Sequence, residues 1–160
     1  MIEQHVLSLA EARRVIDAVI DHATANDHDG VAVYVVDKAG DIIASARMDR
    51  RSARFGKAAH RKAYTGAMFE RDTAGVIKFW DEQERHGHRG PHDWNDPMLT
   101  TLPGGLVVAF GDQVVGGIGV AGGNAHIGDM EFAKVAFDAL GEGFHHYSDW
   151  PQRVRDDAGR

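Results

Sequence analysis

The sequence contains no cysteine, and this absence excludes disulfide bonds, thiolate metal sites and cysteine nucleophiles. No run approaches the roughly 18 apolar residues of a membrane-spanning helix, and the N-terminus lacks the basic start and apolar core of a signal peptide. Cations are not in excess either, because the formal net charge is −6. We therefore expect a cytoplasmic protein without a general attraction to nucleic acid or anionic membranes.

The chain is long enough for one domain with a substantial core. It has 160 residues, of which 43% are hydrophobic and 26% are charged, as is typical of soluble globular proteins. Histidine is frequent, with ten residues, and five of these lie in the two clusters HGHRGPH and HH. Because imidazole binds metals and transfers protons near neutral pH, the first cluster is a candidate functional segment.

Hydrophobic patterning predicts four helices and two β-hairpins. The capping box in SLAE begins the first helix, and the β-branched residues of VAVYVV indicate a buried strand. The predicted helices span 9–26, 53–69, 72–85 and 129–140, and the predicted hairpins join 31–36 to 41–48 and 105–110 to 114–120. Because hairpins pair their strands antiparallel, we expect an α+β fold rather than a doubly wound parallel sheet.

Three glycines in GGIGVAGGN, Gly117, Gly119 and Gly122, match the G-x-G-x-x-G spacing of dinucleotide-binding folds. In those folds the glycines lie between a strand and a helix, and a second parallel strand follows. Here two of the glycines fall within a predicted strand, and no strand is predicted after the last helix. The context argues against a dinucleotide and leaves two interpretations open. The glycines allow a helix or a neighbouring subunit to pack closely, or they form a corner that holds an anion at a helix N-terminus.

Five segments of the chain, taken together, resemble a known family. They are LSLAEARRVIDAVIDHA, VAVYVVDKAGDIIASARMD, KAAHRKAYTGAMF, LPGGLVVAFGDQVVGGIGVAGG and GDMEFAKVAF, and they cover most of residues 7–140. In this order they resemble the GlcG/HbpS family of small haem-binding-type proteins, which includes the C-terminal domain of PduO-type proteins. The resemblance implies a profilin-like α/β/α fold with about five antiparallel strands, the fifth near 98–101. It also implies a homo-oligomer.

The resemblance further implies a small-molecule ligand, for which haem is the first candidate. The family-like residues are Arg47 and Asp49, Lys62 and Thr65, Gly104 and Gly105, and Gly122, Gly123 and Asp129. We expect a domain over 1–140 whose ligand pocket lies between the second helix, the strand end at Arg47 and the corner at Gly122. The loop HGHRGPHDWNDP and the tail over 141–160 depart from the family. The aromatic residues of this tail, Phe144, Tyr147 and Trp150, are expected to pack on the domain or on a neighbouring subunit.

The histidine-rich loop is a candidate metal site. Two or three of His86, His88 and His92, with Asp93 or Asp96, offer enough ligands for a divalent metal. The alternatives are a solvated or interface loop and metal-free catalysis with a histidine as general acid or base. Haem would need an axial ligand, and the four candidates for that role are His60, His88, His92 and His126.

The second helix carries a candidate pair for proton transfer. His60 and Tyr64 are four residues apart and therefore share a helix face, although a surface histidine is the alternative.

Three functional hypotheses remain open. The first is a ligand-binding protein of the GlcG/HbpS type, with haem or a related cofactor. The second is a small lyase-, isomerase- or hydrolase-like enzyme that acts on an aromatic or carboxylated catabolic intermediate. In that enzyme Arg47 or the glycine corner would hold the anion, while His60, Tyr64 or His92 moves protons. The third is a structural oligomer whose loops bind partners.

Overall fold

Both hairpins expected from the sequence form, and they join into one antiparallel sheet. Its strands are β1 (Ala32–Asp37), β2 (Ile42–Arg47), β3 (Gly105–Phe110), β4 (Gln113–Ala121) and β5 (Phe144–His145), in the order β2-β1-β4-β3-β5. The computed structural model describes residues 1–148, with the backbone alone at Pro91 and His92. The expected α+β fold with a five-stranded antiparallel sheet is confirmed.

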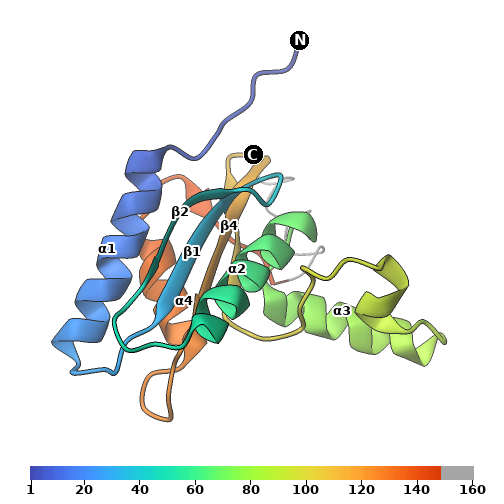
Figure 1. The fold of residues 1–160 in the computed structure, drawn as a ribbon. Coiled ribbons are helices and arrows are strands. Elements are labelled where there is room, and N and C mark those ends of the chain that lie inside the picture. Colours follow the sequence, from blue (N-terminus) through green and yellow to red (C-terminus); the bar gives the residue numbers. More distant parts are fainter. Residues whose placement is uncertain (149–160) are drawn as a thin grey trace.

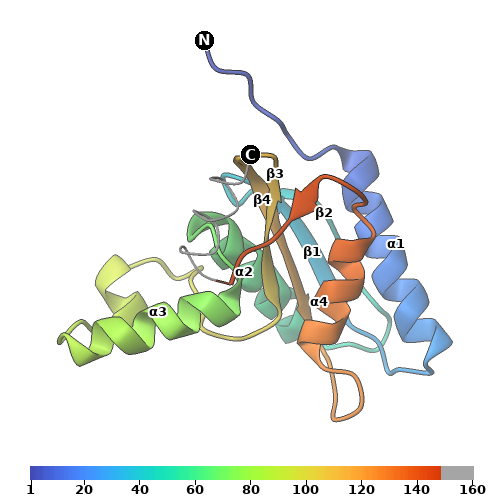
Figure 2. The ribbon, with the colours of Figure 1, turned by 180° about the vertical axis from the view of Figure 1, so that it is seen from behind.

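Helices cover both faces of this sheet (Figures 1 and 2). They are α1 (Leu9–Ala25), α2 (Ala53–Met68), α3 (Thr73–Arg85) and α4 (Asp129–Asp138), and a 3-10 turn, η1, spans Gly90–Trp94. Helices α1 and α4 pack on one face, whereas α2 packs on the other. Helix α3 projects sideways from the body together with η1, so this pair forms an outlying module (Figure 1).

Helix α1 begins where the sequence predicts. The Ser8 hydroxyl accepts the Glu11 backbone N–H at 3.2 Å, and the Glu11 carboxylate accepts the Ser8 backbone N–H at 2.7 Å. A cap of this kind contributes about 1 kcal/mol to helix stability. The buried positions Ala12, Val15 and Val19 then recur at helical spacing and turn one stripe of α1 toward the sheet.

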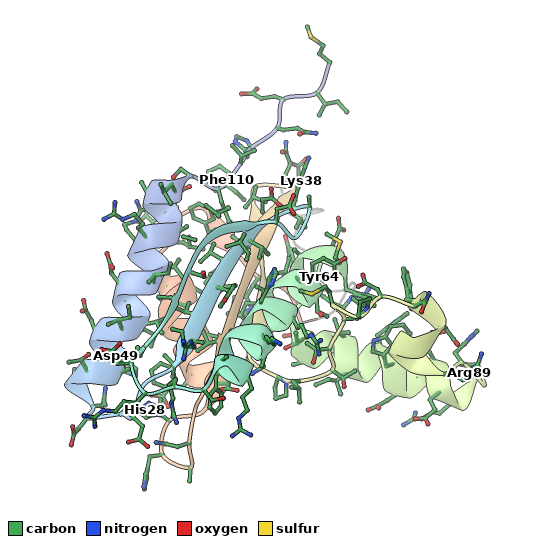
Figure 3. All side chains as sticks on the ribbon, viewed as in Figure 1. His28, Lys38, Asp49, Tyr64, Arg89 and Phe110 are labelled. Atoms are coloured by element: carbon green, nitrogen blue, oxygen red, sulfur yellow. The ribbon has the colours of Figure 1, made fainter. Side chains whose placement is uncertain are left out.

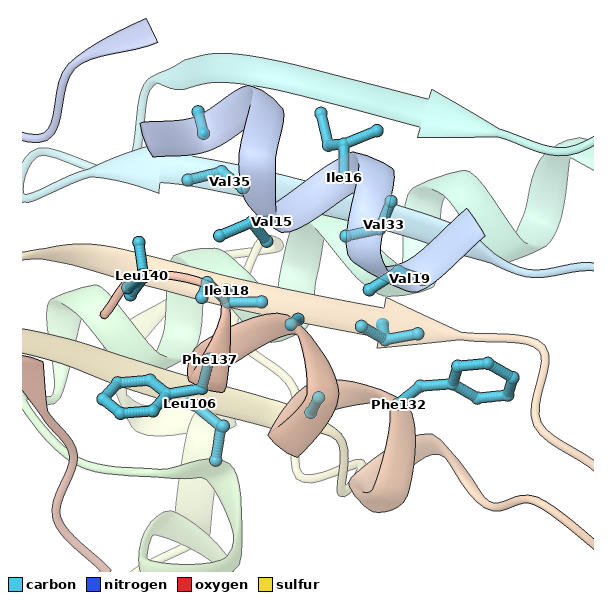
Figure 4. Close-up of a cluster of buried hydrophobic side chains, with 14 of the residues drawn as sticks. Val15, Ile16, Val19, Val33, Val35, Leu106, Ile118, Phe132, Phe137 and Leu140 are labelled. Atoms are coloured by element: carbon cyan, nitrogen blue, oxygen red, sulfur yellow. The ribbon is translucent and has the colours of Figure 1, made fainter. Parts of the chain in front are cut away.

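Large apolar side chains fill the face beneath α1 and α4 (Figure 4). Residues alternate along β1, so Val33 and Val35 point into this layer while Tyr34 points toward α2. Ile118 of β4 and Phe132 of α4 are fully buried beside them. This layer is the main hydrophobic core.

Small residues line the opposite face, where α2 crosses β4. A Cβ on Gly117 or Gly119 would overlap the backbone carbonyl of Ala63 or Ala59, respectively. A Cβ on Gly66 of α2 would in turn lie 3.1 Å from the Leu106 carbonyl oxygen. These two strand glycines therefore let helix and sheet backbones touch, which is the packing interpretation of the glycine-rich segment.

The fifth strand lies elsewhere than expected. Residues 98–101 form no strand, and the edge of β3 pairs instead with Phe144–His145 of the tail. The sequence did not indicate this strand, because two residues carry no period and the pairing depends on the free edge of β3. Phe144 packs on Phe110, with ring centroids 5.0 Å apart, and Tyr147 is buried. Trp150 lies outside the described residues, and the domain boundary at 140 stays a prediction.

None of the helices within residues 1–148 combines the length and the apolar composition that crossing a membrane requires.

Candidate functional site

A buried lysine closes the glycine corner. Lys62 on α2 is only 2% exposed, and its Nζ donates to the Val120 carbonyl at 2.9 Å and to Oδ2 of Asp129 at 2.6 Å. The other carboxylate oxygen of Asp129 accepts the Gly123 backbone N–H at 2.6 Å. Two predicted ligand-binding residues, Lys62 and Asp129, thus bind each other and join α2 to the start of α4.

Arg51, which the sequence did not single out, connects the other predicted residues. Its guanidinium donates to the backbone carbonyls of Gly30 and Gly122, the latter at 2.7 Å. Its own carbonyl accepts a hydrogen bond from the Arg47 guanidinium. The structure therefore brings Arg47 and Gly122 to one end of the sheet, bridged by the Arg51 side chain. The ligand pocket predicted at this place stays a prediction.

Tyr64 and Thr65 fasten the segment that follows η1. The Tyr64 hydroxyl donates to Oδ2 of Asp96 at 2.7 Å, and the hydroxyl of the buried Thr65 accepts the Thr100 backbone N–H at 3.0 Å. The hydrogen bond to Asp96, together with burial and the negative charge of that carboxylate, raises the pKa of Tyr64. The phenol therefore keeps its proton and acts as a donor that holds residues 96–100 against α2.

His60 and Tyr64 share a side of α2 but make different contacts. The His60 ring stacks on Tyr34 of β1, with centroids 5.3 Å apart and planes inclined by 17°. Tyr64, labelled in Figure 3, instead packs against the turn at Gly40, where an added Cβ would overlap its ring. No hydrogen bond or ring stacking joins the His60 and Tyr64 side chains, so their joint catalytic role stays a prediction.

A cavity of about 560 Å³ opens between α3 and the histidine-rich loop. Its lining includes Ile77, Trp80, Asp81 and Glu84 of α3, His88, Arg89 and Gly90 of the loop, and Thr101. A second cavity, of about 150 Å³, lies at the end of the β3–β4 hairpin and includes His5, Phe110 and Phe144. The predicted site residues on α2 and at the glycine corner line neither of these two cavities.

Other aromatic side chains pack around Trp80, which lines the larger cavity. Trp80 is 7% exposed and makes edge contacts with Phe69, Phe79 and Trp94, at centroid distances of 5.6, 5.1 and 6.3 Å. Its buried indole N–H has no hydrogen-bond acceptor within residues 1–148. A buried tryptophan normally finds such a partner, so this wall carries an unsatisfied donor.

The three histidines of the predicted metal site differ in their surroundings. His86 and His88 are both exposed, but His86 ends α3 and only His88 of the two lines the cavity. The side chain of His92 is outside the described residues. Among the described side chains, no three carboxylates or imidazoles are placed to hold a metal ion together. Because His92 is not included, the metal site stays a prediction.

A buried acid–histidine pair lies at the start of α3. Asp72 is 2% exposed, and its Oδ2 lies 2.7 Å from Nδ1 of His146, while its Oδ1 accepts the Val107 backbone N–H at 3.1 Å. Burial raises the pKa of Asp72, against the lowering effect of these hydrogen bonds. The hydrogen bond to Asp72 in turn raises the pKa of His146, although burial opposes it. The Asp72 carboxylate makes no capping hydrogen bond at the start of α3 and instead contacts His146 of the tail and the backbone of β3.

Comparison with known proteins gives the family. A sequence model described as haem degrading protein HbpS-like matches residues 7–138. The chain belongs to the HbpS-like family. Protein GlcG of Escherichia coli K12 is 30% identical over 116 residues, which span 72% of this chain and 81% of that protein.

Solved structures of the family share the fold. A double mutant of Streptomyces reticuli HbpS superposes with a TM-score of 0.74 at 27% identity, covering 89% of this chain and 92% of that one. A PduOC:heme complex superposes with a TM-score of 0.73 at 21% identity, covering 91% and 100%. The resemblance noted in the sequence is therefore confirmed, and this chain is a haem-binding-like protein by family.

Sequence reasoning did not single out Arg51, Asp72 or Trp80, and it named Asp96 only as a possible metal ligand. Arg51 follows Arg50, and Asp96 lies close to Asp93. Nothing in the sequence distinguishes one member of either pair as the functional residue. Trp80 carried the only usable signal, because a tryptophan on the inner stripe of a predicted helix next to a long loop can form a pocket wall. The other three side chains bind partners that are 21 to 74 residues away in the chain.

Proposed function

We propose that this protein binds haem or a closely related planar cofactor in the cavity between α3 and the histidine-rich loop. The volume of this cavity, about 560 Å³, is the observation that carries the proposal, since ligand pockets span roughly 300–1,000 Å³. Membership of a family described as haem degrading supports haem as the ligand, as does the fold shared with a haem complex.

One of the described histidines is better placed than the others to be the axial ligand of haem iron. Haem iron is held by an axial side chain, often histidine. Among the described side chains, His88 lines the larger cavity, whereas His5 lines one of about 150 Å³, which is too small. His60 is stacked on Tyr34 and lines neither cavity. We therefore assign the axial position to His88.

The walls of the cavity suit a flat ligand with an anionic edge. Ile77 and Trp80 supply apolar surface for the macrocycle. The Arg89 guanidinium, 85% exposed and 3.4 Å from Asp93, is available to a carboxylate. Asp81 and Glu84 on the α3 wall repel a carboxylate, so we expect the propionates to face Arg89. Bound haem would supply an iron centre whose reactivity follows the axial ligand and the polarity of these walls.

The test is a titration with haemin, followed through the Soret band, for the natural sequence and three single-residue variants. His88→Ala should weaken binding by about tenfold or more, because it removes the iron ligand. His86→Ala is the matched control: it lies two residues away, is exposed and lines neither cavity, so its affinity should equal that of the natural sequence. An unchanged affinity in His88→Ala, or loss of binding in His60→Ala instead, would contradict the proposal and place the ligand on α2.

A further inference from the structure

The chain after α4 crosses the start of α3 and is fastened there. The backbone N–H of Asp72 donates to the Tyr147 carbonyl at 2.6 Å, next to the 2.7 Å contact between the Asp72 carboxylate and His146. Tyr147 itself is 1% exposed and packs against Val107 and Ala109 of β3. We call residues 144–148 the C-terminal strap.

Helix α3 leaves no space between itself and the strap. A Cβ on Gly75, in the first turn, would overlap the backbone carbonyl of Ser148. The strap therefore touches the helix backbone, and any movement of one requires movement of the other.

Asp72 joins three parts of the molecule. Its carboxylate binds the strap at His146 and β3 at the Val107 N–H, and its carbonyl accepts the N–H of Val76 in α3 at 3.0 Å. The hydroxyl of Thr73 next to it accepts the Gly105 N–H at 3.0 Å. The start of α3 is thus held to the sheet directly and through the strap.

The ligand cavity depends on this attachment. Beyond its first turn α3 extends away from the sheet (Figures 1 and 2). The cavity residues Ile77, Trp80, Asp81 and Glu84 lie along this projecting part. At 1.5 Å per residue, Glu84 is about 18 Å from Asp72, so a tilt of about 10° at the start would move it by about 3 Å.

We infer that Asp72 and His146 are positioning residues for the ligand cavity, because they fasten the C-terminal strap to the start of α3 and so fix its wall. The inference rests on the proposed function in naming the cavity as the ligand site. The attachment itself requires no haem.

The attachment depends on the protonation of His146. Its charged neighbours are Asp72 at the start of α3 and Lys134 and Asp138 of α4, and it packs edge-on against the Phe137 ring at 4.7 Å. Asp72 and Asp138 favour the imidazolium and Lys134 opposes it, and the pKa is raised above its ordinary 6.5. When the pH rises through this raised pKa, the charge-assisted hydrogen bond becomes a neutral one, which is roughly half as strong. We expect α3 to loosen on the alkaline side.

Hydrogen exchange on the ligand-free full chain tests this without haem. Between pH 6 and pH 9, after correction for intrinsic rates, protection of α3 amides should fall by about five- to tenfold, while α2 amides serve as the reference. His146→Gln keeps a donor but cannot titrate, so it should abolish this pH dependence. His126 is an exposed histidine, so His126→Gln is the matched control and should behave like the natural sequence. Equal protection of α3 at both pH values, or the same fall in His146→Gln, would overturn the inference.

Haemin affinity over the same pH range separates the two proposals. We compare each haemin affinity with that of His146→Gln at the same pH. This ratio should fall as the pH rises, both for the natural sequence and for His126→Gln. A pH-dependent α3 in a protein that binds no haemin supports the attachment and overturns the haem proposal. Haemin binding with the same pH profile in all three proteins overturns the positioning role and leaves the haem proposal in place.

Discussion

The two faces of the sheet are built on different principles. Beneath α1 and α4, branched and aromatic side chains such as Val19, Ile118 and Phe132 interdigitate in a conventional core. Beneath α2, glycine and alanine bring the backbones together, and the buried side chains include the polar Lys62 and Thr65. The first face can adapt when a methylene group is lost. The second cannot, because backbone atoms and hydrogen-bonded charges have fixed positions.

This difference explains where the candidate functional residues lie. The residues that the family resemblance selected lie on α2, on β2, at the first residue of β3, at the glycine corner with the start of α4, or in loops, and none is in the large core. The close backbone packing fixes α2 rigidly, and α2 in turn holds the loop through Tyr64 and Thr65. The α2 face therefore holds the segment that leads to Thr101, one of the cavity residues.

Adding one methyl group to the close-packed face should have the greatest effect. In Gly119→Ala the new Cβ would meet the Ala59 carbonyl, so α2 must lift from β4. We expect a loss of about 4 kcal/mol or more in the free energy of unfolding, an exceptional value for one substitution. Urea denaturation would measure it.

Gly128→Ala is the control for that substitution. Gly128 is the N-cap of α4, with a φ of −81° and open space around its Cβ position. Its cost should stay below about 1 kcal/mol. Equal costs for the two glycines would show that the backbones beneath α2 are not in contact.

The buried ion pair should respond unequally to removal of its two partners. Asp129→Ala leaves the ammonium of Lys62 buried without its counter-charge and should cost about 3–5 kcal/mol. Lys62→Met removes the buried charge and leaves a carboxylate that is 26% exposed and still bonded to Gly123, so its cost should be smaller. Thermal denaturation of both variants measures the difference. A costlier Lys62→Met would contradict the view that the ammonium is the charge in need of compensation.

The apolar face should tolerate a comparable change in volume. Ile118→Val removes one methylene group from the core, and we expect a cost of about 0.5–1.5 kcal/mol. Chemical denaturation beside Gly119→Ala compares one carbon removed on this face with one carbon added on the other. A cost as large as that of Gly119→Ala would mean that both faces are equally rigid.

The smallest effect is expected from pH. The pKa of His146 is raised in the folded protein, so the stabilisation is fully present below the ordinary value of 6.5 and is lost as the pH rises through the folded value. The free energy of unfolding should therefore decline on the alkaline side of pH 6.5. His146→Gln should remove this component of the decline, and an identical profile in the variant would show that His146 does not contribute.

Much of the fold could be predicted from local sequence signals. The capping box at Ser8 placed the start of α1, and period-two and period-3.6 patterns placed the four helices and four of the strands. The strand β5 could not be predicted, because a two-residue strand is defined by the free edge of β3 and not by its own residues. The 3-10 turn η1 was not predicted either, because its residues lie in a segment that was predicted to be a loop.

The candidate site was predicted less completely, for a physical reason. The resemblance selected Lys62 and Asp129, but only the fold shows that they bind each other. Pairs such as Asp72 with His146 join residues 74 positions apart, and no periodicity connects them. His88 was one of four histidines that the sequence could not rank as an axial ligand. His88 lines the cavity and His60 and His126 do not, which distinguishes it from these two. It is not distinguished from His92, whose side chain is not described.

The position of the iron decides whether the outlying module of α3 and η1 is the ligand site. Anomalous diffraction at the iron edge, from crystals of the haemin-loaded full chain, would locate it independently of any variant. We expect one iron peak between α3 and η1, at bonding distance from a nitrogen of His88. An iron peak over α2 beside His60, with the cavity free of haemin, would contradict the proposed function.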